Sequence, residues 1–156
     1  MFKISIIVKL ALVFSFNSLD ASVKNITNII NDINHSIDDI KNKYILIKHD
    51  IFSPKNSVST NYSTYSYSLT TISSQLSASR YEIFEKLLNL DIEQKHIDKI
   101  SKIKLKSELL NNAICVLQSI NKYHISYDKN NHNSFEDYKI QVKRLASYEN
   151  FLSQIE

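Results

Sequence analysis

The stretch SVKNITNIINDINHSIDDIKNKYILI, residues 22–47, decides the fold class. Its apolar side chains return in steps of three and four, and such steps place them along one narrow side of a helix. Asn, Asp, Lys, Ser and His fill the positions between them. An isolated helix of this composition is marginal in water, so the apolar seam must be buried against other helices. The seam residues are Val23, Ile26, Ile30, Ile33, Ile37, Ile40, Tyr44 and Ile47.

The rest of the chain carries the same apolar spacing, and its expected seam residues include Leu69, Ile72 and Leu76, then Ile97 and Leu105, then Phe135, Leu145 and Phe151. Pro54 stops the first helix, Asp91 begins a new one as its N-cap, and Ser134 is a third N-cap that is followed by acidic residues. The segment from Ser57 is rich in Ser, Thr and Tyr, but its apolar spacing still favours a helix over a linker. The sequence therefore predicts helices over 22–50, 57–89, 92–125 and 134–155.

Four amphipathic helices with short connections predict an all-α, antiparallel up-down four-helix bundle, with seams like those of coiled coils. The alternative is an extended helical hairpin that forms a homo-oligomer through the same seams. Both arrangements bury the apolar stripes; they differ in whether the partner helices belong to one chain.

The N-terminus has the features of a secretory signal peptide over 1–21. Lys3 gives a positive start, Leu10 to Phe16 are apolar, and Leu19 and Ala21 stand at the −3 and −1 positions of a cleavage site. Lys9 interrupts the apolar run, which is too short for a comfortable membrane span. We expect a secreted or extracytoplasmic protein with no membrane span after cleavage.

The composition excludes several functions. The chain has no Gly, which phosphate-binding loops and dinucleotide-binding turns require for a close approach of the backbone. The formal charge is only +3 and Arg80 and Arg144 are the only arginines, whereas nucleic-acid binding needs a concentrated basic face. We therefore expect no nucleic-acid partner and no cofactor.

Two segments resemble metal sites only in part. Glu93 and His96 have the Glu-x-x-His spacing of di-iron bundles, but Asp32 and His35, the nearest second pair, should point outward from the seam. The turn over 128–133 begins like a calcium loop but lacks its Gly and its final Glu, and two histidines beside it, His124 and His132, have no carboxylate support. No metal site is predicted.

Cys115 and a group of tyrosines are the remaining candidates. Cys115 lies in an apolar stretch, which favours a buried thiol; the alternative is a disulfide between two chains. Tyr62, Tyr65 and Tyr67 are candidates for a partner surface, because Tyr supplies contact area at low entropic cost. Asn25, Asn34 and Asn61 stand in glycosylation sequons, for which chance in an Asn-rich chain is the simpler explanation.

The predicted function follows from an export signal, regular seams and the lack of a catalytic set. We expect a non-enzymatic helical protein that is secreted or displayed on a surface and binds a protein partner, such as a microbial or parasite effector that binds a host protein. The alternative is a carrier that holds a lipid or another apolar ligand between its helices.

Overall fold

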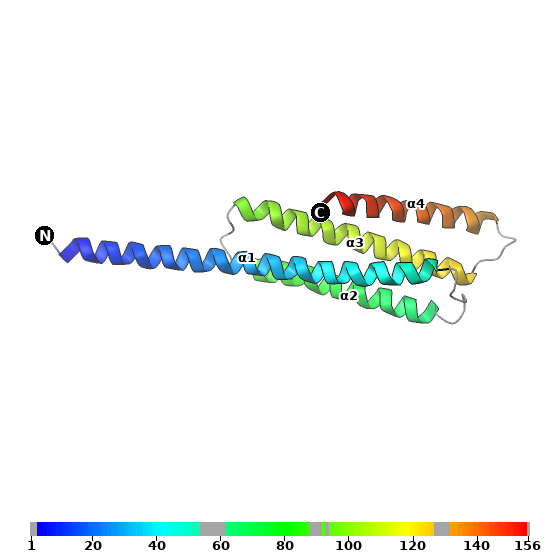
Figure 1. The fold of residues 1–156 in the computed structure, drawn as a ribbon, viewed down its shortest axis with the longest axis horizontal. Helices are drawn as coiled ribbons and strands as arrows, with labels where there is room; N and C mark the ends of the chain where they lie inside the picture. Colours follow the sequence, from blue (N-terminus) through cyan, green and yellow to red (C-terminus); the bar gives the residue numbers. More distant parts are fainter. Residues whose placement is uncertain (1–2, 54–61, 88–91, 93, 127–131, 156) are drawn as a thin grey trace.

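The computed structural model contains four long helices: α1 (Lys3–Phe52), α2 (Tyr62–Leu87), α3 (Gln94–Ser126) and α4 (His132–Ile155) (Figure 1). It describes residues 3–53, 62–87, 92, 94–126 and 132–155, without the side chains of 3–24, 83, 84, 86, 95, 124–126 and 132–134. Successive helices run in opposite directions, and the described residues include no strand. The predicted all-α, up-down four-helix bundle is confirmed.

The C-terminal end of α1 agrees with its sequence signal, whereas the starts of the third and fourth helices are shifted from the predicted positions. α1 ends at Phe52, two residues before Pro54, and the Ser53 amide donates to the Asp50 carbonyl oxygen over 3.2 Å. The predicted helical residues 57–61, 88 and 89 lie outside the described residues. α3 begins at Gln94, two residues later than expected, and the described Ile92 is not helical. α4 begins at His132, two residues earlier than expected, so Ser134 lies inside the helix and its predicted role as the N-cap is wrong.

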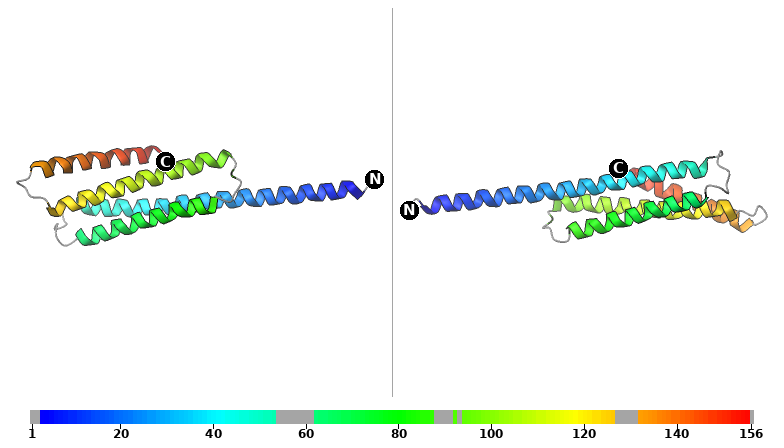
Figure 2. Two further views of the ribbon diagram at one scale, coloured as in Figure 1. Left: turned by 180° about the vertical axis from the view of Figure 1, so that it is seen from behind. Right: turned by 90° about the horizontal axis from the view of Figure 1, so that it is seen from below.

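The first helix is longer than predicted, because α1 begins at Lys3 instead of Ser22. The Ile, Leu, Val and Ala residues before Ser22 are compatible with a helix, and no Gly or Pro interrupts them. As a result, the N-terminal part of α1 extends beyond the ends of the other helices (Figures 1 and 2). The signal peptide over 1–21 stays a prediction.

A single hydrophobic core joins the helices, and α1 contributes to it most regularly. Six of its predicted seam residues are less than 6% exposed: Ile26, Ile30, Ile33, Ile37, Ile40 and Tyr44. α2 adds Leu69, Ile72 and Leu76, and α3 adds a run from Leu110 to Ile120. Burial of each such side chain favours folding by roughly 1.5–3 kcal/mol before entropic costs, which explains why the Ser- and Thr-rich α2 is helical.

The four helices do not pack equally. α1, α2 and α3 pack directly against one another, whereas α4 packs directly only against α3 among the described residues. Among the described side chains, α4 adds two buried hydrophobic residues, Leu145 and Leu152. Side chains of α4 nevertheless reach α1, so α4 covers part of the groove between α1 and α3 from outside.

The prediction of buried positions is wrong at several residues of α3 and α4. Ile97, Leu105, Phe135 and Phe151 are exposed instead of buried. Because α3 has neighbours on three sides, its buried face is wider than one seam and takes in the polar side chains of Lys106 and Ser107. α4, with one close neighbour, buries a narrower stripe than its apolar residues suggested.

Candidate functional site

The predicted tyrosine surface divides into an outer and an inner part. Tyr67 is 75% exposed, whereas Tyr62 and Tyr65 are half-buried and Tyr65 packs against the core. Tyr62 also provides the carbonyl oxygen that accepts a hydrogen bond from Asn121 Nδ2 over 3.4 Å, which joins the start of α2 to α3. Of the three candidates, Tyr67 alone offers its ring to a partner.

Tyr67 lies at the edge of an apolar groove between α1 and α2, on the outer side of the bundle. We call it the α1/α2 groove, and its volume is about 330 Å³. Leu46 of α1 is 67% exposed there, and Ile72 of α2 is buried. The lining residues are Lys43, Leu46, Ile47, Tyr67, Ser68, Thr71, Ile72 and Gln75.

Polar groups close the rim of the α1/α2 groove. Lys43 Nζ donates to Gln75 Oε1 across the two helices over 3.3 Å. The Thr71 hydroxyl donates to the Tyr67 carbonyl oxygen over 2.9 Å, so it has a partner already. An apolar centre with a satisfied polar rim is the usual anatomy of a protein-binding surface.

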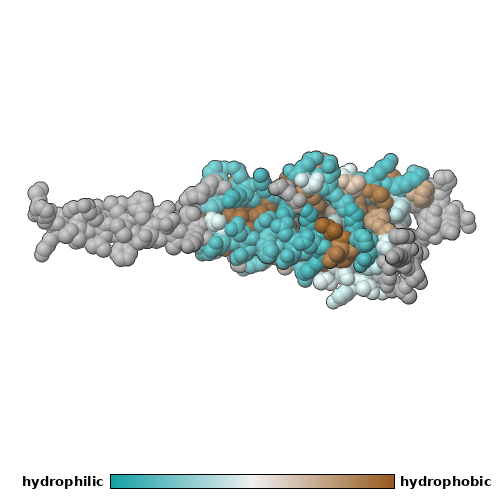
Figure 3. Space-filling model, viewed as in Figure 1, coloured by the Kyte–Doolittle hydropathy of each residue, from teal (hydrophilic) through white to brown (hydrophobic). Residues whose placement is uncertain are grey.

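A second pocket lies between α1 and α3, where the C-terminal end of α4 stops. We call it the lysine pocket; its volume is about 540 Å³. In this region the hydrophobic side chains form a strip between hydrophilic ones (Figure 3). Its lining residues are Ile30, Asn31, Asn34, Asp38, Lys99, Lys102, Ile103, Lys106 and Ile155.

Lys106 is the buried charge of this pocket, with 8% of the residue exposed. Its Nζ lies 2.5 Å from Asp38 Oδ1 and donates to Asn34 Oδ1 over 3.4 Å. Asn34 Nδ2 in turn donates to Asp38 Oδ2 over 3.3 Å. A buried ammonium is tolerated only when it is paired and hydrogen-bonded, and these two residues of α1 meet that requirement.

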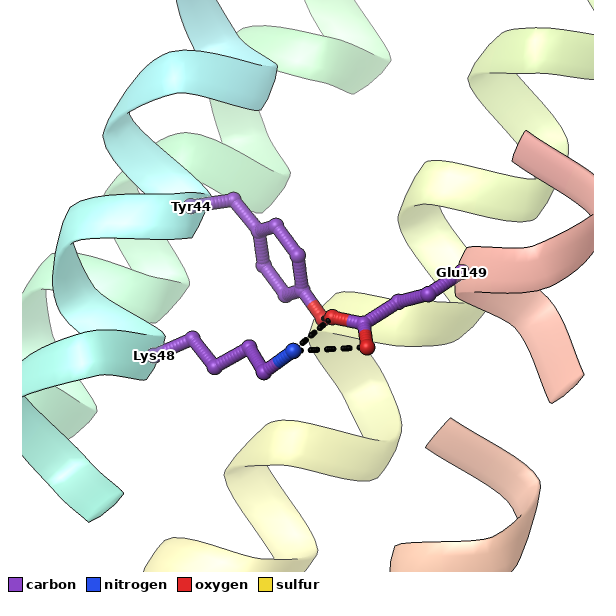
Figure 4. A network of polar contacts seen from close by, with 3 residues as sticks. All are labelled: Tyr44, Lys48 and Glu149. Atoms are coloured by element: carbon purple, nitrogen blue, oxygen red, sulfur yellow. Dashed lines mark hydrogen bonds and ion pairs between the residues drawn. The ribbon is translucent and has the colours of Figure 1, made fainter. Parts of the chain in front are cut away.

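A third polar cluster joins α4 to α1 (Figure 4). The Tyr44 hydroxyl donates to Glu149 Oε1 over 2.7 Å, and Lys48 Nζ lies 2.6 Å from both oxygens of the same carboxylate. Burial raises the pKa of the Tyr44 phenol, and the hydrogen bond to the negative Glu149 raises it further. This cluster holds α4 in place and offers no free group for chemistry.

The histidine and carboxylate candidates do not converge. Asp32 and His35 are exposed, as predicted, while Glu93 and the turn over 128–131 lie outside the described residues. His96 is buried and neither of its ring nitrogens has a hydrogen-bond partner. Within the described residues, no group of three or more His, Cys, Asp or Glu side chains is placed to hold a metal ion.

Cys115 is exposed, so the prediction of a buried thiol is wrong. It stands on α3 between the buried residues Ile114 and Leu117, on the side of the helix that faces away from the core. Exposure is compatible with the alternative, a disulfide between two chains, which stays a prediction.

Comparisons with known proteins do not assign the chain to a family. The sequence matches no family model, and neither the curated proteins nor the solved structures give a match. In the part of the chain that the structure describes, no helix combines the length and the apolar character that a membrane crossing requires.

Sequence reasoning missed Leu46 and Lys106, although both left a signal. Tyr44, Ile45, Leu46 and Ile47 are consecutive, and a narrow seam cannot hold four neighbours, so some of them had to form a second apolar face. Lys106 stands three residues after Ile103 and four before Leu110, so it shares a helix face with these two apolar residues. A charged residue at a position that the spacing reserves for an apolar one was the signal.

Proposed function

We propose that this chain is a non-enzymatic helical protein that binds an amphipathic helix of a partner protein in the α1/α2 groove. The observation that carries the proposal is the pair of large, exposed side chains, Leu46 and Tyr67, on either side of an apolar groove. The predicted export signal would make the chain a secreted or surface protein, and an effector that binds a host protein is one role of this kind.

The packing of α4 on the bundle suggests that the occupant of the α1/α2 groove is also a helix. α4 is an amphipathic helix that lies over the groove between α1 and α3, where it buries Leu145 and Leu152. The groove between α1 and α2 also has an apolar lining, and no helix covers it among the described residues. A partner helix there would contact little more than one turn of α1, over residues 43–47, and about two turns of α2, over residues 67–75. The α2 wall suits partner anchors at positions i, i+3 or i+4, and i+7.

The lining residue types also fit a protein partner. Tyr is enriched among residues that dominate binding energy, and Tyr67 would supply such an aromatic contact beside the apolar centre of the groove. Lys43 and Gln75 already form a hydrogen bond with each other. A partner helix that binds in the groove beside Tyr67 would therefore leave neither the Lys43 nor the Gln75 side chain without a partner.

The chain offers a matched control for the experiment. Tyr81 is on the same helix and is 69% exposed, but it does not line the groove. A photo-crosslinking amino acid would replace Tyr67 or Tyr81 in the full chain, and adducts would be mapped by mass spectrometry. We expect the crosslinker at position 67 to form adducts with one helical segment of one partner protein. The crosslinker at position 81 should form no adducts with that segment.

Affinity then tests the contact itself. The crosslinked partner segment would be made as a peptide, and its Kd measured for Tyr67→Ser and Tyr81→Ser. We expect about 10- to 30-fold weaker binding for Tyr67→Ser, the size of a hot-spot loss, and an unchanged Kd for Tyr81→Ser. Equal affinities for the two variants, or equal adducts from the two positions, would refute the proposal.

The carrier function is the second candidate, and the arrangement of α4 favours it. Within the described residues, α4 packs closely only against α3 and reaches α1 through Glu149, so its release would open the core without breaking the contacts among α1, α2 and α3. Native mass spectrometry of the full chain would then show a bound lipid. A ligand-free spectrum after incubation with fatty acids and lysophospholipids would refute this function.

A further inference from the structure

We propose that the lysine pocket binds an organic phosphate monoester, with the phosphate at the lysines and an apolar group on the isoleucines. This site is separate from the α1/α2 groove, because no described residue lines both and the lysine pocket lies on the α3 side of α1. The pocket volume of about 540 Å³ is in the range of small-molecule sites.

The charge of the pocket comes from one face of α3. Lys99, Lys102 and Lys106 stand at positions i, i+3 and i+7, so successive turns of the helix bring their side chains into the same pocket. The three lysines meet a single acid, Asp38, among the lining residues, and two positive charges remain. A phosphate monoester carries nearly two negative charges at neutral pH, which would balance them.

The three lysines have different roles. Lys106 is held by Asp38 and Asn34, so its charge is already compensated and its position is fixed. Lys99 and Lys102 are exposed at the mouth, and no described residue forms an ion pair with either of them. These two are the groups that would donate to the phosphate oxygens as point charges. Asn31, on the opposite wall, adds an amide.

Below the charges lies an apolar surface. Ile30 of α1 and Ile103 of α3 are buried core residues that also line the pocket, and Ile155 closes the end where α4 stops. Inorganic phosphate would contact only the upper, charged part. An ester with an aryl or alkyl group would also cover the isoleucines, which is why the proposal names an ester.

Three probes separate charge from apolar contact: phenyl phosphate, inorganic phosphate and phenol. Each would be titrated into the full chain at pH 7.5 and low salt by calorimetry. We expect saturable binding of phenyl phosphate, at least tenfold weaker binding of inorganic phosphate, and no measurable binding of phenol. Added NaCl should weaken the binding of phenyl phosphate, since Lys99 and Lys102 are accessible to screening ions.

Lys104 and Lys143 provide the control, because both are exposed lysines outside the pocket. Lys99→Gln/Lys102→Gln and Lys104→Gln/Lys143→Gln change the total charge equally. We expect about tenfold weaker binding of phenyl phosphate for each pocket lysine removed, and an unchanged Kd for the control variant. Neither pair belongs to the buried core, so both variants should fold, which circular dichroism would check.

A further arm distinguishes a free ester from a lipid head group. Vesicles of phosphatidylcholine with 10% phosphatidic acid would be tested by co-sedimentation. If the chain binds these vesicles and Lys99→Gln/Lys102→Gln does not, the natural ligand is a lipid head group. If the chain binds phenyl phosphate but not the vesicles, the natural ligand is a free ester. Either result supports the site.

Equal binding by the two double variants, or no saturable binding of any phosphate probe, would overturn the proposal. Tyr67→Ser should bind phenyl phosphate like the wild type, so failure here is independent of the proposed partner helix.

Discussion

Glu149 is the residue whose change tests how α4 is attached. Its carboxylate accepts hydrogen bonds from the Tyr44 hydroxyl and from Lys48, both on α1, while α4 and α1 do not approach closely along their backbones in the described part of the chain (Figure 4). We expect Glu149→Ala to lower the free energy of unfolding by about 2–3 kcal/mol and Glu149→Gln by about 1 kcal/mol.

The difference between the two variants comes from Tyr44. Tyr44 is 2% exposed, so water cannot replace a lost acceptor, and an unpaired buried hydroxyl costs about 1–3 kcal/mol. Gln keeps an oxygen for that hydroxyl and removes only the ion pair. The Lys48 and Glu149 side chains are 34% and 28% exposed, so solvent screens their attraction and about 1 kcal/mol is the upper end of what it contributes.

Urea unfolding monitored by circular dichroism would measure both variants against Glu136→Gln. Glu136 belongs to the same helix and pairs with Lys139 over 2.9 Å, but both side chains are about half exposed, so its change should cost less than about 0.5 kcal/mol. Hydrogen exchange should show the loss of protection for Glu149→Ala mainly in α4. A Glu149→Ala variant as stable as Glu136→Gln would refute the reasoning.

Three further changes probe the core and the buried polar groups. Leu76→Ala, at a fully buried site, should cost about 2–5 kcal/mol in urea unfolding, whereas Leu46→Ala on the surface should change stability by less than about 0.5 kcal/mol. Folding raises the pKa of Tyr44, so above pH 10 the phenol loses its proton in the unfolded chain before it does so in the folded one. The free energy of unfolding should therefore fall as pH rises, by up to about 1.4 kcal/mol per pH unit. Tyr44→Phe should remove that part of the slope in urea unfolding measured at alkaline pH. Lys106→Met, which keeps the aliphatic stem, should cost about 1 kcal/mol and Lys106→Ala about 2 kcal/mol by the same assay, because Asp38 is partly exposed and can be hydrated.

The sequence predicted the helices and the seam of α1 well for a physical reason. On α1 the apolar residues are spaced by three and four and separated by polar ones, so only one face can be buried, and Ile26 to Tyr44 are buried as expected. The same argument worked for Leu69, Ile72 and Leu76 on α2 despite its Ser and Thr. Periodicity is reliable when a helix buries a single narrow face.

Prediction failed where burial depends on how many neighbours a helix has. In the described part of the chain, α3 packs against three helices, so Lys106 and Ser107 are buried beside its apolar residues. There α4 packs closely against one helix, so Phe135 and Phe151 remain exposed. The number of helices that pack against a given helix cannot be read from a single sequence. The sequence also could not place Leu46 beside Tyr67, because that proximity depends on the register between α1, which ends at Phe52, and α2, which begins at Tyr62.

Polar contacts between helices supply that register. Ser36 and Ser79 share a hydrogen bond of 3.0 Å between α1 and α2, Ser73 donates to Asn111 over 3.3 Å between α2 and α3, and Lys106 bonds Asp38 between α3 and α1. Apolar seams of Ile and Leu can slide by one turn with little loss, whereas a buried polar group that loses its partner is costly. The helices are therefore brought together by their seams and fixed along their axes by a few polar pairs. The α1/α2 groove is formed by residues from two helices and the lysine pocket by residues from three, so the shape of both depends on these pairs as much as on the apolar core.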